Sequence, residues 1–246
     1  MPRFLKPIFC LLITVATAAA ADAPLQGSRQ CLVVQTDDLT SKRGDLAAFS
    51  RESDDAPWTR RGDPFEVVVG QAGLAWGRGL ADVSGQKGPT KREGDRKAPA
   101  GIFRLGQAFG YAPASAAKAV KLPYLALTAD FEGVDDPSSR FYNRIVERSK
   151  ADQIDWKTAE KMRRKDTLYR WGVVVEYNTS PAVPGAGSCI FLHIWRNAGS
   201  GTAGCTAMPE DRLVDLLSWL DPKEKPALVQ LPRDAYEALR VAWKLP

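Results

Sequence analysis

A histidine and a cysteine twelve positions apart form a pair of side chains suited to nucleophilic catalysis. His193 is the only histidine among the 246 residues and lies in the apolar run 189–195, and Cys205 follows Gly204 after a polar turn. A thiol attacks as its thiolate, and an imidazole is the commonest side chain that takes such a proton near neutral pH. The pair therefore suffices for a thiol active site. The alternative is that both residues are merely buried core residues.

The residues around this pair predict a strand, a tight loop and a helix. The strand period of two places Phe191, His193 and Trp195 on one face of the run, and residues 190, 192 and 194 on the other. Pro209, followed by two acidic residues, is a typical helix start, and the leucines of 213–220 repeat as one apolar face. The positive end of this helix is expected near Cys205, where it favours a thiolate.

The rest of the chain reads as short strands within one large domain. Apolar runs predict strands at 31–35, 65–69, 122–127, 171–177 and 228–231, and the glycines of 70–88 predict hairpins and close backbone approaches. Helices are predicted at 152–166, whose basic residues form either a solvated face or a surface for anionic groups, and at 234–244. We expect a mainly β domain with short helices over 30–232, with a C-terminal helix in 233–246 packed on it.

The N-terminus predicts export. Residues 1–21 combine Arg3 and Lys6 with an apolar stretch and four alanines at 18–21, which is typical of a cleaved signal peptide rather than of a membrane anchor. Loss of Arg3 and Lys6 lowers the formal charge from +5 to +3. No basic block with interleaved aromatic residues indicates nucleic-acid binding. Of the three mature cysteines, Cys31 and Cys189 either form a disulfide or are both simply buried.

Two motifs together resemble a known family. The segment from His193 to Thr202-Ala203-Gly204-Cys205 resembles the signature of YkuD-type L,D-transpeptidases, in which a histidine precedes a Ser/Thr-x-Gly-Cys turn. The upstream segment Asp95 to Phe103, with Ala98-Pro99-Ala100-Gly101, is similar to the Thr-Pro-x-Gly-x-Phe motif of that family. The export signal and the closing Gly-Cys-Thr-Ala-Met sequence are similar to those of an uncharacterised, periplasmic-type branch of the family.

The resemblance implies a β-sandwich-like catalytic domain that acts on peptidoglycan stem peptides in the periplasm or cell envelope. It implies that Cys205 is the nucleophile and His193 the general base and acid, with a thioester acyl-enzyme as intermediate. Backbone N–H groups around Gly204 and Cys205, in the turn that begins at Thr202, would stabilise the oxyanion. The reaction needs no metal or organic cofactor, and one histidine with scattered cysteines disfavours a zinc site.

The chain departs from the family pattern at Ala203, where many members carry a second histidine. His193 must then be the base, and the choice between transfer to an acceptor amine and hydrolysis by water stays open. A secreted β-rich binding domain with an inactive site is a further alternative. Polarity and aromatic character alone suggest five substrate-side residues: Trp195, Arg196, Tyr142, Asn143 and Arg144.

Overall fold

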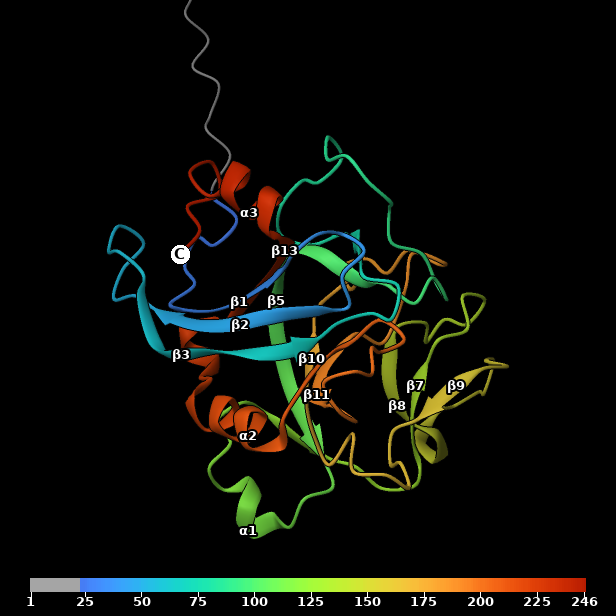
Figure 1. Ribbon diagram of the computed structural model, residues 1–246. Helices are drawn as coiled ribbons and strands as arrows, with labels where there is room; N and C mark the ends of the chain where they lie inside the picture. Colours follow the sequence, from blue (N-terminus) through green and yellow to red (C-terminus); the bar gives the residue numbers. More distant parts are fainter. Residues whose placement is uncertain (1–22) are drawn as a thin grey trace, which may run out of the picture.

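Strands from both ends of the chain meet in one ten-stranded sheet in this computed structural model, which describes residues 23–246 (Figure 1). The signal peptide expected at 1–21 lies outside the described residues. In chain order, the strands of this large sheet are β1 (Gln30–Thr36), β2 (Arg43–Ser50), β3 (Thr59–Val68), β4 (Leu74–Trp76), β5 (Ala98–Gly110), β6 (Tyr124–Ala126), β10 (Trp171–Val175), β11 (Phe191–Ile194), β12 (Thr206–Met208) and β13 (Ala227–Pro232).

The large sheet closes on itself. Its strands follow the order β10-β11-β12-β3-β2-β1-β13-β5-β4, and β10 also pairs with β5. β1 lies between β2, which is antiparallel to it, and β13, which is parallel. Because β1 and β13 are covered on both sides, they read as continuous apolar runs rather than as alternating ones. The mainly β fold with short helices is confirmed, and the sandwich takes the form of a closed sheet.

A smaller sheet lies beside the large one, on the right in Figure 1. Its strands are β7 (Phe131–Val134), β8 (Arg144–Glu147) and β9 (Ala159–Lys161), in the order β8-β7-β9. The helices are α1 (Ala114–Ala117), α2 (Glu210–Trp219) and α3 (Arg233–Leu239), with short 3-10 turns at Arg148–Lys150 and Pro222–Glu224. No helix within 23–246 is long and apolar enough to cross a membrane.

Two hydrophobic clusters position the elements that carry His193 and Cys205. The larger fills the closed sheet and includes the leucines of α2, as the helical spacing of 213–220 predicts. The smaller cluster contains Phe109, Tyr169, Phe191 and Cys205. Phe191 and His193 both lie against the Tyr169 ring, whereas residues 190, 192 and 194 enter the larger cluster. The expected alternation of faces along β11 is thus confirmed.

The strands expected from the short apolar runs are present, with adjusted ends. β11 is shorter than the run 189–195, because Cys189 has a φ of 52° and so cannot continue a strand. Close backbone approach among the glycines is confirmed at Gly73, where an added Cβ would lie 2.2 Å from the Leu39 carbonyl oxygen. The expected hairpins there are largely replaced by β4, which runs parallel to β5.

The helix predicted at 152–166 is wrong. This segment consists of turns and β9, which pairs with β7. Trp156 donates from Nε1 to Glu132 at 2.8 Å, and Lys161 forms an ion pair with the same buried carboxylate. Met162 is buried in the smaller cluster. These long-range contacts outweigh the local helix preference of the charged residues.

The C-terminus and the cysteines also differ from expectation. The helix expected at 234–244 ends at Leu239 in α3, and turns follow it. Cys31, Cys189 and Cys205 are all free thiols, so the possible Cys31–Cys189 disulfide is absent from the described chain. The alternative that both cysteines are buried holds for Cys31, which lies in the larger cluster, and largely for Cys189, which lies beside the smaller one.

Candidate active site

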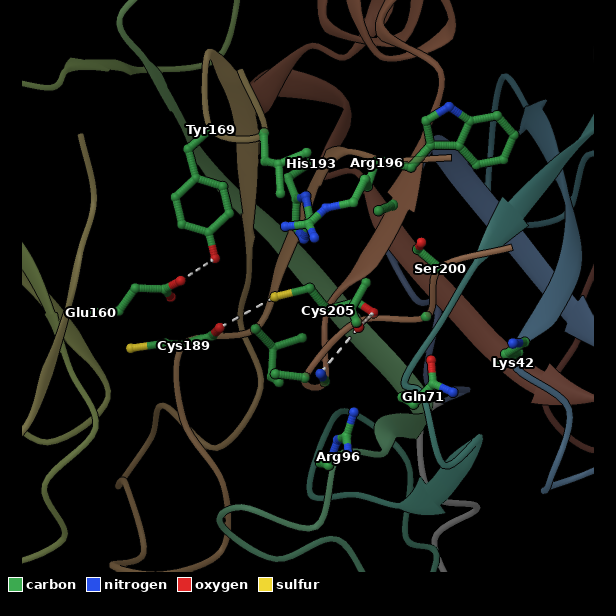
Figure 2. A pocket seen from close by; sticks show the side chains of 18 of the residues that line it. Lys42, Gln71, Arg96, Glu160, Tyr169, Cys189, His193, Arg196, Ser200 and Cys205 are labelled. Carbon is green, nitrogen blue, oxygen red and sulfur yellow. Dashed lines mark hydrogen bonds between the residues drawn. The ribbon is translucent and has the colours of Figure 1, made fainter. Parts of the chain in front are cut away.

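Cys205 and His193 line one cavity of about 750 Å³ (Figure 2). Cys205 stands directly before β12, and His193 lies in β11, which is parallel to β12 with His193 paired to Ala207. This register places Cys205, two residues before Ala207, beside the start of β11, so residues twelve positions apart in the sequence come to lie on neighbouring strands. The two side chains are only 7% and 6% exposed, so this exposure is through the cavity that both line.

Two backbone groups hold the sulfur of Cys205. The Phe191 N–H donates to Sγ at 3.4 Å, and the thiol donates to the Cys189 carbonyl oxygen at 3.5 Å. The N–H favours a thiolate, whereas the carbonyl favours the protonated thiol, because it accepts the S–H proton and repels a negative sulfur. The resting site therefore holds Cys205 as an oriented thiol.

The turn before Cys205 is fixed by one hydroxyl. Thr202 Oγ1 accepts from the Gly204 N–H at 3.1 Å and donates to the Cys205 carbonyl at 2.6 Å. The Gly204 N–H expected at the oxyanion is thus already engaged with Thr202. A Cβ at Gly204 would lie 3.2 Å from the Lys97 carbonyl oxygen, so the turn is closely packed at this position.

The imidazole of His193 is held in one tautomer. Its Nδ1 lies 2.7 Å from the carbonyl oxygen of Ile194, and a carbonyl can only accept a hydrogen bond. We therefore assign the proton of the neutral ring to Nδ1, which leaves Nε2 as an unprotonated acceptor. The Tyr169 ring meets the imidazole edge-on, with centroids 5.1 Å apart, and fixes its plane. This is the tautomer that a general base requires.

Burial makes the resting pair neutral. It raises the pKa of the Cys205 thiol to about 12 and lowers the pKa of His193 to about 4. Near neutral pH the sulfur is therefore protonated and the imidazole uncharged. The expected help from the helix start does not reach the sulfur directly, because α2 follows β12, whose three residues span about 10 Å. A nucleophilic role for Cys205 would therefore require the thiol to pass its proton to the imidazole as it attacks.

A tyrosine–glutamate pair forms the cavity wall beside the sulfur. The Tyr169 hydroxyl donates to Glu160 Oε1 at 2.8 Å, and Arg164 binds the same carboxylate at 3.3 Å. Burial raises the pKa of Glu160 despite these partners. Figure 2 shows the tyrosine hydroxyl pointing toward Glu160 on the Cys205 side of the cavity. Neither residue was anticipated from the sequence.

Cationic side chains enter the cavity from three separate segments. Lys42 precedes β2, Arg96 lies in the charged loop 91–97, and Arg196 follows β11 (Figure 2). Two further cations of the cavity wall are neutralised, since Lys91 pairs with Asp95 and Arg164 with Asp166. In the described part of the chain, Lys42, Arg96 and Arg196 form no ion pair. These three side chains, called here the cationic rim, can bind anionic groups such as carboxylates.

The structure separates the five residues suggested as substrate-side. Trp195 and Arg196 line the cavity. Tyr142, Asn143 and Arg144 are not among its lining residues. Tyr142 is buried and bonded to Glu93, Asn143 bonds to three backbone groups, and Arg144 lies exposed in β8, near the ring of Phe141. Polarity and aromatic character alone therefore did not distinguish residues that line the cavity from residues that lie outside it.

The comparison with protein families agrees with these motifs. The family model YkuD, described as the L,D-transpeptidase catalytic domain, matches residues 58–229, which is well over half of the chain. The chain belongs to the YkuD family. No curated protein and no solved structure matches it. The YkuD match runs from the end of the 51–58 loop into β13 and includes both His193 and Cys205.

The first two strands precede the YkuD match but belong to the same sheet. β1 pairs with β13 and β2 with β3, so residues before position 58 complete the closed sheet. Within 23–246, no group of three or more His, Cys, Asp or Glu side chains is arranged to hold a metal ion. The cavity of this YkuD domain thus combines a thiol, an imidazole, the backbone groups that bind them and a cationic rim.

Proposed function

We propose that this protein is an exported cysteine L,D-transpeptidase that acts on peptidoglycan stem peptides in the periplasm or cell envelope. Membership of the YkuD family supports the L,D-transpeptidase class. The observation that carries the mechanism is the shared cavity of Cys205 and His193, with His193 Nε2 free to accept a proton. Export rests on the basic, apolar and alanine-rich pattern of residues 1–21.

In the first half-reaction, the thiol attacks the carbonyl of the peptide bond that joins an L-centre to a terminal D-residue. The S–H proton turns from the Cys189 carbonyl to His193 Nε2 as the C–S bond forms. Because the Gly204 N–H is engaged with Thr202, we assign the oxyanion to the backbone N–H of Cys205. Collapse of the intermediate breaks the C–N bond. His193 returns the proton to the departing amine, and a thioester remains on Cys205.

In the second half-reaction, an amine of a neighbouring stem attacks the thioester. Neutral His193 takes the proton of that amine and returns it to the departing sulfur, which restores the thiol. Attack by water in place of the amine would give a shortened peptide. The same thiol site thus serves a transferase or a carboxypeptidase, and the acceptor decides between them.

The cationic rim supports a stem peptide as substrate. Stem peptides carry free carboxylates, and Lys42, Arg96 and Arg196 offer unpaired positive charge at three points around the cavity. No organic cofactor or metal enters the proposed reaction.

Product analysis tests the proposal and separates transfer from hydrolysis. The mature protein is incubated with a purified tetrapeptide stem, with and without an acceptor stem, and the products are identified by mass spectrometry. We expect a cross-linked dimer when the acceptor is present. A tripeptide alone under both conditions would assign the site to hydrolysis. Unchanged tetrapeptide throughout would contradict both activities and leave a binding domain.

A further inference from the structure

Cys189, whose carbonyl accepts the hydrogen bond of the Cys205 thiol, has a backbone conformation that needs support. Cys189 has a φ of 52°, in the left-handed region, which costs a non-glycine residue roughly 1–2 kcal/mol. Its carbonyl oxygen nevertheless lies 3.5 Å from the sulfur of Cys205. Its own side chain takes no part in this contact, since Figure 2 shows the Cys189 sulfur pointing away from Cys205. Contacts from another part of the chain must therefore hold the Cys189 carbonyl in place.

Asn143 supplies that support. Its Oδ1 accepts from the Cys189 N–H at 2.8 Å, and its Nδ2 donates to the carbonyls of Tyr177 and Asn178, both also at 2.8 Å. The amide thus ties the segment before β11 to the end of β10. Asn143 itself has a φ of 65°, which asparagine tolerates better than most residues do.

The residue before Asn143 holds the two preceding positions of the same segment. The Tyr142 hydroxyl accepts from the Gly187 N–H at 3.0 Å and donates to Glu93 at 2.6 Å. Glu93 in turn accepts from the Ser188 hydroxyl at 2.7 Å. Tyr142 and Asn143, called here the 142–143 clamp, therefore fix residues 187, 188 and 189 in succession.

We propose that Asn143 is a positioning residue for the nucleophile: by fixing the Cys189 backbone, it keeps Cys205 protonated and correctly aimed at rest. This inference rests on the proposed role of Cys205 in catalysis. A sulfur held between an N–H and a carbonyl has one favoured rotamer, and the carbonyl disfavours thiolate until substrate binds. If residue 189 is no longer held, the sulfur loses its favoured rotamer and the carbonyl no longer disfavours thiolate. The thiol of Cys205 then ionises more readily but is no longer directed toward the substrate.

The test compares Asn143→Gly with the unmodified protein. Glycine tolerates the positive φ of residue 143, so the variant isolates the loss of the amide. Iodoacetamide alkylation of Cys205 is followed over a range of pH by mass spectrometry of the peptide that contains it. We expect the rising profile of the variant to be displaced to lower pH, so that at each pH between 7 and 11 Cys205 is alkylated faster than in the unmodified protein. We also expect kcat on a tetrapeptide stem to fall by about 10- to 100-fold with little change in KM.

A matched control is Gln30→Ala. Gln30 is also a buried amide that bonds to backbone groups, at Trp219 and Asp221, but it lies in β1, beside Cys31. We expect this variant to leave the Cys205 profile unchanged, and alkylation of Cys31 reports general loosening in both variants. An unmoved Cys205 profile in Asn143→Gly, or equal movement in both variants, overturns the proposal.

If Asn143→Gly fails to fold, Tyr142→Phe decides. It removes only the hydroxyl that holds Gly187 and Glu93, and we expect a smaller shift of the Cys205 profile in the same direction. No shift in a folded Tyr142→Phe variant overturns the proposal. The alkylation profile needs no stem peptide. Absence of turnover in the unmodified protein would therefore reject the proposed function without deciding the role of the clamp.

Discussion

The Nδ1 nitrogen of His193 lies 2.7 Å from the carbonyl oxygen of Ile194, the next residue along β11. This contact occupies the proton of the neutral ring and leaves Nε2 as the only basic nitrogen. The site therefore combines an uncharged base with a protonated thiol, rather than a preformed thiolate and imidazolium.

The pH dependence of alkylation tests the state of Cys205. With its pKa raised by burial to about 12, the thiolate fraction should grow about tenfold for each pH unit above neutrality. We expect the rate of Cys205 modification by iodoacetamide to rise steadily from pH 7 toward pH 11. A plateau near neutral pH would instead indicate a thiolate–imidazolium pair and contradict this charge state.

Stability at acid pH tests the state of His193. The pKa of its imidazole falls from an ordinary value of 6.5 to about 4 on burial, so the unfolded chain takes up a proton first as the pH falls. The stabilisation that the uncharged His193 gives the folded state is complete above pH 6.5 and is lost as the pH falls toward 4. Between about pH 7 and pH 5, the free energy of unfolding should fall by about 2 kcal/mol more in the unmodified protein than in His193→Gln. Denaturant titrations at pH 7 and pH 5 measure the free energy of unfolding of both proteins. An equal fall in the two proteins would refute the assignment of a buried, uncharged His193.

The Thr202 hydroxyl should be needed for activity. Thr202→Val keeps the side-chain shape but removes the bonds to the Gly204 N–H and the Cys205 carbonyl, and loss of two such bonds costs about 1–3 kcal/mol. We expect kcat to fall by about 10- to 100-fold as the turn loosens. Thr202→Ser, which keeps the hydroxyl, should restore most of it. A fully active valine variant would show that the turn does not depend on this hydroxyl.

The cationic rim should act on substrate affinity. Arg196→Gln should raise KM for a stem with free carboxylates by about 5- to 50-fold, the effect of losing one charge-assisted contact, with kcat nearly unchanged. Arg96→Gln and Lys42→Gln should act in the same direction.

The matched control is Lys223→Gln, which removes an exposed cation outside the cavity. A stem with amidated carboxylates should bind the unmodified protein and Arg196→Gln equally. An unchanged KM in all three rim variants would remove the rim from substrate binding.

The sequence predicted the parts of the site whose signal is local. His193 and Cys205 were recognisable because the strand period and the Thr-x-Gly-Cys turn lie within one short segment. Tyr169 and Glu160 carried no such signal, because they meet the cavity only after β9 and β10 pair with distant strands. The helix expected at 152–166 failed for the same reason, since Trp156 and Lys161 bind Glu132 across the small sheet. Asn143 was singled out for its polarity, but its three backbone bonds depend on contacts more than thirty residues away.

Detection of the acyl-enzyme tests the central claim most directly. The mature protein is mixed with a tetrapeptide stem without acceptor, quenched in acid and analysed by intact and peptide mass spectrometry. We expect an adduct on Cys205 with the mass of the stem less its terminal D-residue, and no adduct in Cys205→Ala. An adduct that persists in Cys205→Ala, or free D-residue released without any thioester on Cys205, would contradict nucleophilic catalysis by this thiol.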